Sequence, residues 1–164
     1  MKISIITANY NNEATLSACF ESVKCQTYLN IEHIIIDGAS NDGSIDTIKT
    51  YSKFPHVRYY SAKDNGIYDA LNKGIKKATG DVIGFLHADD MFAGKNVVQN
   101  IVSKFESNKC DGVYGDLHYF RGSTPVNIIR NWVSRPFKKS LLKQGWMPQH
   151  PTLYIKAKLY QKNG

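Results

Sequence analysis

The sequence predicts an α/β fold in which helices flank a mostly parallel sheet. Short β-branched apolar segments alternate along the chain with amphipathic helical segments, which is the pattern of parallel sheets. Polar clusters follow directly on several of the apolar segments, where ligands bind in such sheets. With 164 residues, 42% of them apolar, the chain is long enough for one domain with a hydrophobic core.

The first half of the chain alternates between predicted strands and predicted helices. Residues 2–8 are apolar and β-branched, which predicts a buried strand. A helix is expected from Glu13 to about Gln26, because apolar side chains recur there at the spacing of one helix face. By the same criteria we expect a strand at 31–36, a helix at 45–53 capped by Ser44, a strand at 57–61, a helix at 66–79 and a strand at 82–86.

The second half begins as regularly and then loses its pattern. A helix is expected at 96–107 and a strand at 112–119. After Gly122 we expect irregular structure, with a short strand at 152–155 and a last helix beyond it. We therefore divide the chain into an α/β portion, residues 1–120, and a second portion, residues 121–164.

Charge separates the same two portions. Residues 1–120 carry 12 Lys or Arg and 14 Asp or Glu, whereas residues 121–164 carry 9 Lys or Arg and no acid. An anionic partner for the second portion would explain this excess, and so would a basic face that only contacts solvent. Nucleic acid, anionic lipid and a diphosphate-bearing acceptor are the partners that such a charge would suit. Nucleic acid is not expected, because aromatic residues do not alternate regularly with the positive ones.

The compartment predicted by the sequence is the cytoplasm. No apolar run approaches the length of about 20 residues that spans a bilayer, and the N-terminus lacks the features of a signal peptide. The three cysteines, Cys19, Cys25 and Cys110, show neither zinc-site spacing nor an even number, so we expect small hydrophobic core residues or inert thiols.

Three polar clusters are expected at the carboxyl edge of the sheet, namely residues 7–12, 37–43 and 87–90. Asp89 and Asp90 follow a buried strand, where two carboxylates are costly unless a cation such as Mg²⁺ or Mn²⁺ neutralises them. An exposed turn with two solvated acids is the alternative. Asp37 ends a strand and suits a nucleobase or a ribose, or else it closes its own loop.

A fourth polar segment, residues 63–74, leads into a helix. Asp64 and Asn65 are placed to cap that helix. Asp69, Asn72 and Lys73 share one helix face, from which Lys73 would reach a phosphate or form a surface ion pair. The five histidines lack ligand spacing, and no Walker A loop, GxGxxG or GxSxG motif is present.

The order of these motifs resembles family 2 glycosyltransferases, in particular bacterial enzymes of exopolysaccharide, colanic-acid and O-antigen assembly in the cell envelope. The motifs are SIITANYN at 4–11, IIDGASNDGS at 35–44, DNGIYDALNKG at 64–74, TGD at 79–81 and FLHADD at 85–90. The resemblance implies a GT-A fold. It also implies an inverting hexosyltransferase that uses a nucleoside-diphosphate sugar, expected to be a UDP-sugar, and a divalent metal ion, Mg²⁺ or Mn²⁺.

The same resemblance implies roles for individual residues. Asp37 would bind the base, Asp89 would hold the metal ion with Asp90 beside it, and His150 would lie on the acceptor side. The donor site implied by the resemblance takes in Thr7, Asn9, Asn11, Asp37, Asp64, Asn72, Lys73, His87 and Asp89.

Two departures from the family pattern matter. His87 stands where many members have Asp, which removes one negative charge from the metal site. The family's later acidic motif, which supplies the catalytic base, would lie beyond Gly164, and no acid follows Asp116. We therefore expect a truncated chain that binds a nucleotide sugar and transfers the sugar poorly or not at all.

Partners follow from the same resemblance. The acceptor is expected to be a saccharide or a polyprenyl-linked molecule, and the basic portion suits peripheral contact with the inner membrane. Exposed apolar surface would favour homo-oligomers. A nucleotide-sugar-binding protein without transferase activity is the alternative. Nucleotidyltransferases usually have a glycine-rich loop where residues 9–12 stand here, so that class is disfavoured.

Overall fold

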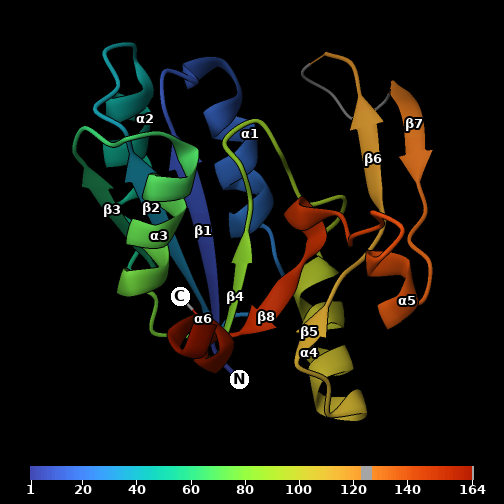
Figure 1. Cartoon of the computed structure of the whole chain (residues 1–164). Helices are drawn as coiled ribbons and strands as arrows, with labels where there is room; N and C mark the ends of the chain where they lie inside the picture. The colour runs from blue at the N-terminus through green and yellow to red at the C-terminus, as the bar shows by residue number, and fades with distance from the viewer. Residues whose placement is uncertain (123–126, 164) are drawn as a thin grey trace.

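The computed structural model describes residues 1–122 and 127–163 and contains a central six-stranded sheet in the order β3-β2-β1-β4-β8-β5 (Figure 1). The first four of these strands are parallel, and β8 lies antiparallel between β4 and β5. The strands are β1 (Ile3–Asn9), β2 (Ile31–Asp37), β3 (Val57–Ser61), β4 (Val82–Phe85), β5 (Gly112–Val113) and β8 (Tyr154–Lys156). The predicted mostly parallel α/β sheet is confirmed.

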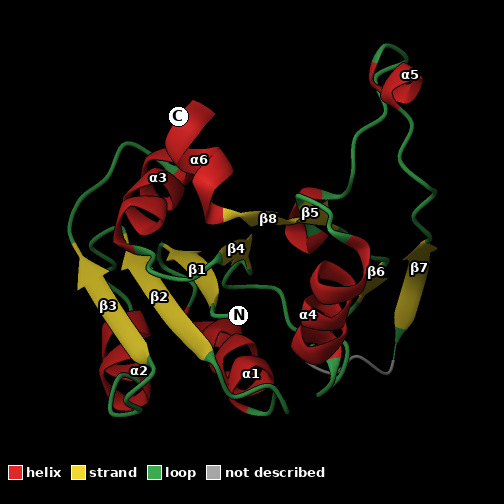
Figure 2. Ribbon diagram, turned by 90° about the horizontal axis from the view of Figure 1, so that it is seen from below, coloured by secondary structure: helices red, strands yellow, loops and turns green. Residues whose placement is uncertain are grey.

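Helices cover both faces of this sheet (Figure 2). One face carries α1 (Glu13–Lys24), α2 (Ser44–Tyr51) and α4 (Val97–Asn108), and the other carries α3 (Ile67–Lys77) and α6 (Ala157–Asn163). Alternation along the strands supplies both cores, because successive side chains point to opposite faces. The larger core lies against α1, α2 and α4 and the smaller one against α3 and α6.

The positions of the three cysteines match the prediction made from the sequence only in part. Cys19 is buried in the larger core, where burial raises the pKa of its thiol to about 12 and keeps it unreactive. Cys25 is exposed, and all three thiols are free.

The prediction of a single strand at 112–119 is wrong, because this segment contributes to two separate strands. β5 stays in the main sheet, whereas β6 (Leu117–Phe120) pairs with β7 (Ile128–Trp132) in a separate hairpin that stands apart from the sheet (Figure 1). Ser134 fixes the bend between them: its hydroxyl donates to the Gly115 carbonyl at 2.6 Å and its N–H to Asp116 Oδ1 at 2.7 Å.

The expectation of irregular structure after Gly122 is also wrong for part of that segment. β7 is a strand, and α5 (Lys139–Leu142) and the 3₁₀ turn η1 (His150–Thr152) follow it. The strand expected at 152–155 begins two residues later, as β8. Residues 123–126 and Gly164, which belong to the predicted second portion, lie outside the described residues.

Ser44 was predicted to cap α2 (Ser44–Tyr51), but it is the first residue of that helix. Gly43 occupies the cap position without a side-chain cap, and Asp42 Oδ1 accepts the Ser44 N–H at 2.9 Å. The Ser44 hydroxyl instead accepts the Asn12 N–H at 3.2 Å and so joins two loops.

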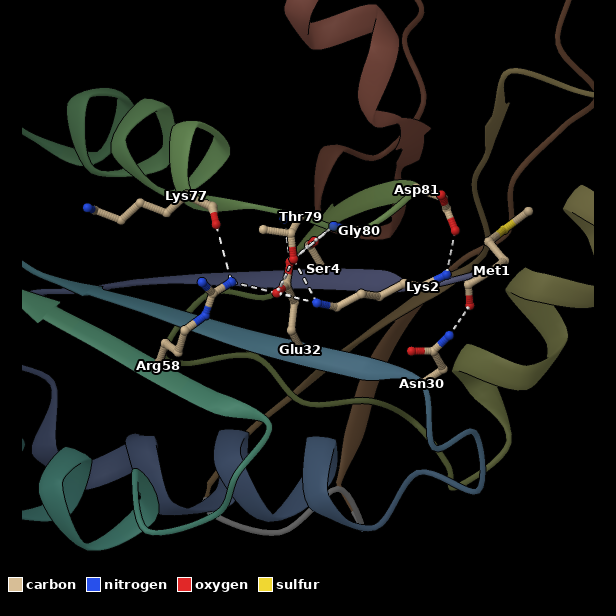
Figure 3. Close-up of polar contacts among 10 residues, drawn as sticks. All are labelled: Met1, Lys2, Ser4, Asn30, Glu32, Arg58, Lys77, Thr79, Gly80 and Asp81. Carbon is tan, nitrogen blue, oxygen red and sulfur yellow. Dashed lines mark hydrogen bonds and ion pairs between the residues drawn. The ribbon is translucent and has the colours of Figure 1, made fainter.

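A buried carboxylate ties together the amino ends of the central strands, at the sheet edge opposite the polar clusters (Figure 3). Glu32 of β2 accepts hydrogen bonds from Ser4 Oγ at 2.5 Å and from the Thr79 N–H at 2.6 Å. It also pairs with Lys2 at 2.8 Å and with Arg58 at 2.5 Å. None of the helices that the structure describes is long and apolar enough to cross a membrane.

Candidate functional site

The loops after β1 and β2 are joined at the carboxyl edge of the sheet. Asn11 donates its N–H to Ser40 Oγ at 2.9 Å, and its side-chain Oδ1 accepts the Asn41 N–H at 2.9 Å. Asn11 adopts φ 48°, a left-handed conformation that asparagine tolerates better than most residues. The pairing of parallel strands β1 and β2 in register brings these two loops together, as the strand-end rule predicts.

Asp37 lies at the centre of this junction and is fully buried. Its carboxylate accepts hydrogen bonds from Asn9 Nδ2 at 2.8 Å, from the Ser40 N–H and hydroxyl at 3.0 and 2.5 Å, and from the Ser61 hydroxyl at 2.7 Å. Burial alone raises the pKa of Asp37, but the hydrogen bonds from Ser40, Ser61 and Asn9 lower it below its usual value. Asp37 therefore remains ionised and holds three segments together.

A cavity of about 650 Å³ opens beside this junction. It is lined by Ala8, Asn9, Tyr10, Asn12, Gly38, Lys63, Asp64, Gly66, Ile67, Ala70, His87, Ala88, Asp89 and His150. Its volume is within the range of pockets that bind small molecules and cofactors. The fold thus brings five of the predicted site residues to one cavity: Asn9, Asp64, His87, Asp89 and His150.

Asn9, which lines this cavity, carries an unsatisfied polar atom. Its amide nitrogen is committed to Asp37 and to Ser40 Oγ, whereas its Oδ1 is buried without a hydrogen-bond partner among the described residues. A buried acceptor without a partner is costly, so this atom is suited to a donor group on a ligand.

Gly38 allows two cavity side chains to come close together. A Cβ added at this position would lie 2.9 Å from Asp64 Oδ2 and 3.2 Å from the Tyr10 ring. Asp64 itself accepts the Gly66 N–H at 2.9 Å, which matches its predicted place at the start of α3, although Gly66 is the cap residue. The glycine that follows Asp37 therefore shapes the wall of the cavity.

Other predicted residues do not line this cavity. They are Thr7, Asn11, Asp37, Asn72, Lys73 and Asp90. Thr7 is fully buried: its hydroxyl donates to the Leu86 carbonyl at 2.7 Å and therefore accepts from His33 Nε2 at 2.8 Å. Burial lowers the pKa of His33 to about 3, so its ring is neutral and the two residues fasten β1, β2 and the end of β4.

For Lys73 the sequence left two alternatives, contact with a phosphate or a surface ion pair. The structure contains the ion pair. Its Nζ lies 3.0 Å from Asp69 Oδ2 and donates to the Lys63 carbonyl at 3.3 Å. Asp69 also accepts the Asn65 N–H at 3.0 Å. Lys73 and Asp69 thus support the segment that presents Lys63 and Asp64 to the cavity, while Asn72 is exposed on the helix.

The loop after β4 combines two carboxylates with a histidine. Asp89 is exposed and lines the cavity, while burial and the Asp89 charge raise the pKa of its neighbour Asp90. Burial lowers the pKa of His87, whose ring lies 5.5 Å from that of His150, centroid to centroid.

A divalent cation fits these carboxylates only with help from its substrate. Among the described residues no group of three or more His, Cys, Asp or Glu side chains could hold a metal ion. Mg²⁺ and Mn²⁺ commonly take one or two protein carboxylates and complete their coordination with phosphate oxygens and water. Of the two carboxylates only Asp89 lines the cavity, so Asp89 is the one placed for that arrangement, and a cation there would relieve its repulsion with Asp90.

Sequence reasoning missed several lining residues, above all Tyr10, Lys63 and Ile67. The side chains of Tyr10 and Ile67 are 65% and 50% exposed at this cavity. A signal was available for Tyr10, because it is an aromatic residue within the polar cluster at 7–12, which was expected at the ligand-binding edge of the sheet. Ile67 and Lys63 gave no comparable signal, since their position depends on how α3 packs against β1 and β2.

The chain matches known proteins over nearly its whole length. Residues 4–163 match the family described as Glycosyl transferase family 2. An uncharacterized glycosyltransferase of Nostoc is 36% identical over 125 residues, which is 75% of this chain and 38% of the relative. Glycosyltransferase GlyA of Streptococcus pneumoniae is 30% identical over 123 residues, 74% of this chain and 18% of the relative. The chain thus spans less than half the length of these relatives.

Solved structures share the fold. The mannosyltransferase PcManGT of Pyrobaculum calidifontis, in complex with GDP-Man and Mn²⁺, superimposes with a TM-score of 0.75 at 18% identity and covers 99% of this chain. S. aureus TarS in complex with UDP-GlcNAc gives the same TM-score and identity over 99% of this chain. This chain covers 46% and 47% of those two structures. The likeness confirms the predicted GT-A fold.

Proposed function

The chain belongs to glycosyl transferase family 2, and on that premise we propose that it binds a nucleoside-diphosphate sugar in the 650 Å³ cavity and takes part in transfer of the sugar, with inversion, to an acceptor. The observation that carries this proposal is the cavity itself. It joins an exposed aromatic ring, an unsatisfied buried amide oxygen and the Asp89 carboxylate at the carboxyl edge of a parallel sheet. Such edges are where α/β folds bind nucleotides.

Each part of the donor has a matching group in this proposal. Tyr10 offers its ring face to the nucleobase, since stacking of a base on an aromatic side chain contributes about 1–3 kcal/mol. Asn9 Oδ1 accepts from a base or ribose donor group, and Asp64 accepts from sugar hydroxyls. Lys63 and His150 lie at the cavity wall, where they meet the diphosphate and the acceptor respectively.

Asp89, with Asp90 behind it, is proposed to hold Mg²⁺ or Mn²⁺ against the diphosphate. When bound, such an ion draws off the negative charge that develops on a leaving diphosphate. The protein's own contribution is to bind and orient the donor, with Asp37 and the Lys73–Asp69 pair keeping the cavity walls in place. UDP is the expected nucleotide, and GDP and dTDP are the alternative nucleotides to test.

Calorimetric titration of the purified chain with UDP, GDP and dTDP, with and without Mn²⁺, tests this proposal. We expect micromolar binding of UDP that Mn²⁺ strengthens and that Asp89→Asn weakens at least about tenfold, a loss of about 1.4 kcal/mol. Asp46→Asn is the matched control, because Asp46 is an exposed carboxylate that does not line the cavity. Failure of all three nucleotides to bind would refute the donor site.

The basic second portion is proposed to contact an anionic membrane surface that carries a polyprenyl-linked or saccharide acceptor. Exposed cations there accompany exposed apolar side chains on the hairpin and around α5, which stand apart from the sheet (Figure 1). Each Lys or Arg near an anionic surface contributes about 1 kcal/mol to binding. The residues concerned are Arg121, Ile129, Arg130, Val133, Arg135, Phe137, Lys138, Lys139, Leu142, Lys143 and Met147.

Co-sedimentation with phosphatidylglycerol vesicles tests this contact. Charge reversal at Lys138, Lys139 and Lys143 should abolish vesicle binding at low salt. The same change at Lys49, Lys53 and Lys95, which are exposed on the first portion, should not. Equal retention of both variants, or equal retention by phosphatidylcholine vesicles, would contradict it.

A further inference from the structure

The Ser134 hydroxyl joins three segments of the chain. It follows β7 and lies 2.6 Å from the Gly115 carbonyl oxygen, in the loop after β5, and 2.7 Å from Oε1 of Gln149, directly before η1. At the other end of η1, the Thr152 hydroxyl lies 3.1 Å from the same Gly115 carbonyl oxygen and 2.9 Å from that of Gln149. Hydrogen bonds therefore hold η1 at both of its ends.

The side-chain amide of Gln149 fits this set of hydrogen bonds as a donor. Gln149 is 5% exposed, and its Nε2 has no hydrogen-bond partner among the described residues. The Ser134 hydroxyl has one proton, which the Gly115 carbonyl accepts, so the amide atom beside Ser134 Oγ has to be a donor. Exchange of the two amide atoms, which have almost the same shape, places Nε2 at this position. The link between Ser134 and Gln149 then gives the buried NH₂ group a partner.

The turn held in this way carries His150. This residue is the first of η1, and it lines the cavity of about 650 Å³ that we propose for the donor, here called the donor cavity. Its ring contacts that of His87 at a centroid distance of 5.5 Å and an angle of 61°. Because the His150 side chain is exposed, the position of its ring depends on the position of the turn.

We propose that Ser134 and Gln149 are positioning residues, which act through η1 to hold the His150 ring at the wall of the donor cavity. This inference rests on the proposed function, in which His150 meets the acceptor. A side chain at a binding site keeps a defined position where its supporting residues are themselves fixed by packing and hydrogen bonds. Since the Ser134 N–H also fixes the bend of the hairpin, this one residue ties the hairpin to the donor cavity.

The nuclear Overhauser effect (NOE) between the ring protons of His87 and His150, measured on the chain without nucleotide, tests the proposal. The unaltered chain should show this NOE, because the two rings are in contact. Ser134→Ala and Gln149→Met should each weaken it at least about twofold, because loss of one buried hydrogen bond shifts the balance between two conformations about fivefold. Ser134→Thr keeps the hydroxyl and should retain the NOE.

Asp116→Ala is the matched control. Asp116 accepts the Ser134 N–H and helps to fix the bend of the hairpin, but it has no part in the link between Ser134 and Gln149. A purely structural role of Ser134 at the bend would make this variant behave as Ser134→Ala does, whereas the positioning role predicts an unchanged NOE between His87 and His150. An NOE that survives both Ser134→Ala and Gln149→Met, or that Asp116→Ala weakens as much, would overturn the proposal.

Circular dichroism checks that each variant is folded, and titration of the unaltered chain with UDP separates failure of this proposal from failure of the proposed function. The NOE is measured without nucleotide, so it does not depend on the donor site. Absence of UDP binding together with the expected NOE pattern removes the donor site and supports the positioning of His150. UDP binding together with an NOE that neither substitution changes removes only the positioning role.

Discussion

Replacement of Glu32 by glutamine should destabilise the fold although Glu32 lies far from the cavity. Glu32 is buried at the amino ends of the strands, with Lys2 and Arg58 as cationic partners and Ser4, Thr79 and Gly80 as hydrogen-bond donors (Figure 3). The amide of glutamine keeps the shape of the carboxylate but not its charge. Its NH₂ group, itself a donor, would face the donors that now bind the second carboxylate oxygen. Part of this donor set is thereby left without an acceptor.

The magnitude follows from the pKa of Glu32. Burial raises this pKa, but hydrogen bonds from Lys2, Ser4 and Thr79 outweigh burial and lower it from 4.5 to about 2. At about 1.4 kcal/mol per pKa unit this shift corresponds to about 3 kcal/mol. Because the side chains of Lys2 and Arg58 are 36% and 41% exposed, solvent screens part of the attraction, and we expect a loss of about 2 kcal/mol.

The sign of the pH dependence is fixed by the direction of the shift. A carboxyl group whose pKa is lower in the folded state stabilises the fold above the unfolded pKa, and this contribution is lost as the pH falls from 4.5 towards 2. The difference between the unaltered chain and Glu32→Gln should thus be constant from pH 7 to 5 and narrow below pH 4.5.

Urea unfolding followed by circular dichroism at pH 7, 5, 4 and 3.5 measures this difference. Glu21→Gln is the control, because Glu21 forms an ion pair with Lys24 on the exposed side of α1 and should matter by less than about 0.5 kcal/mol. The reasoning is refuted if the two variants are equally stable at pH 7, or if the gap widens in acid.

Two further predictions concern the cavity wall and a buried histidine. Gly38→Ala places a methyl group 2.9 Å from Asp64 Oδ2 and should weaken UDP binding about tenfold. Gly94→Ala is the control, because a Cβ at Gly94 meets nothing within 4 Å, and it should leave UDP binding unchanged. Equal affinities of the two variants for UDP in calorimetry would contradict this prediction. Burial, with a smaller contribution from His56, lowers the pKa of His33 from 6.5 to about 3, so the folded state resists protonation and stability should fall as the pH drops below 6.5, by up to about 1.4 kcal/mol per pH unit. His33→Gln should flatten this slope in urea unfolding between pH 7 and 5, and an unchanged slope would assign the acid sensitivity to other groups.

Local pattern was enough to predict the elements that form the α/β portion. The strand at Val57–Ser61 was predicted without error, and the helices at 13–24, 67–77 and 97–108 were placed to within a few residues. Periodicity succeeds there because each element buries one face against the sheet. It failed at 112–119, where the apolar pattern continues but Ser134, distant in sequence, binds the backbone at the bend and diverts the chain into a hairpin.

At the candidate site, too, local pattern predicted which residue types are present but not how their side chains are arranged. The sequence by itself determined that polar side chains stand at the carboxyl ends of β1, β2 and β4, because strand and loop patterns are local. Only the tertiary structure decided which of them line a cavity. Asp37 and Thr7 turn into the protein and fasten strands, whereas Asn9, Asp64 and Asp89 open to one cavity. Side-chain direction at a strand end depends on partners such as Ser61 and His33, which lie on other strands and which no local pattern identifies.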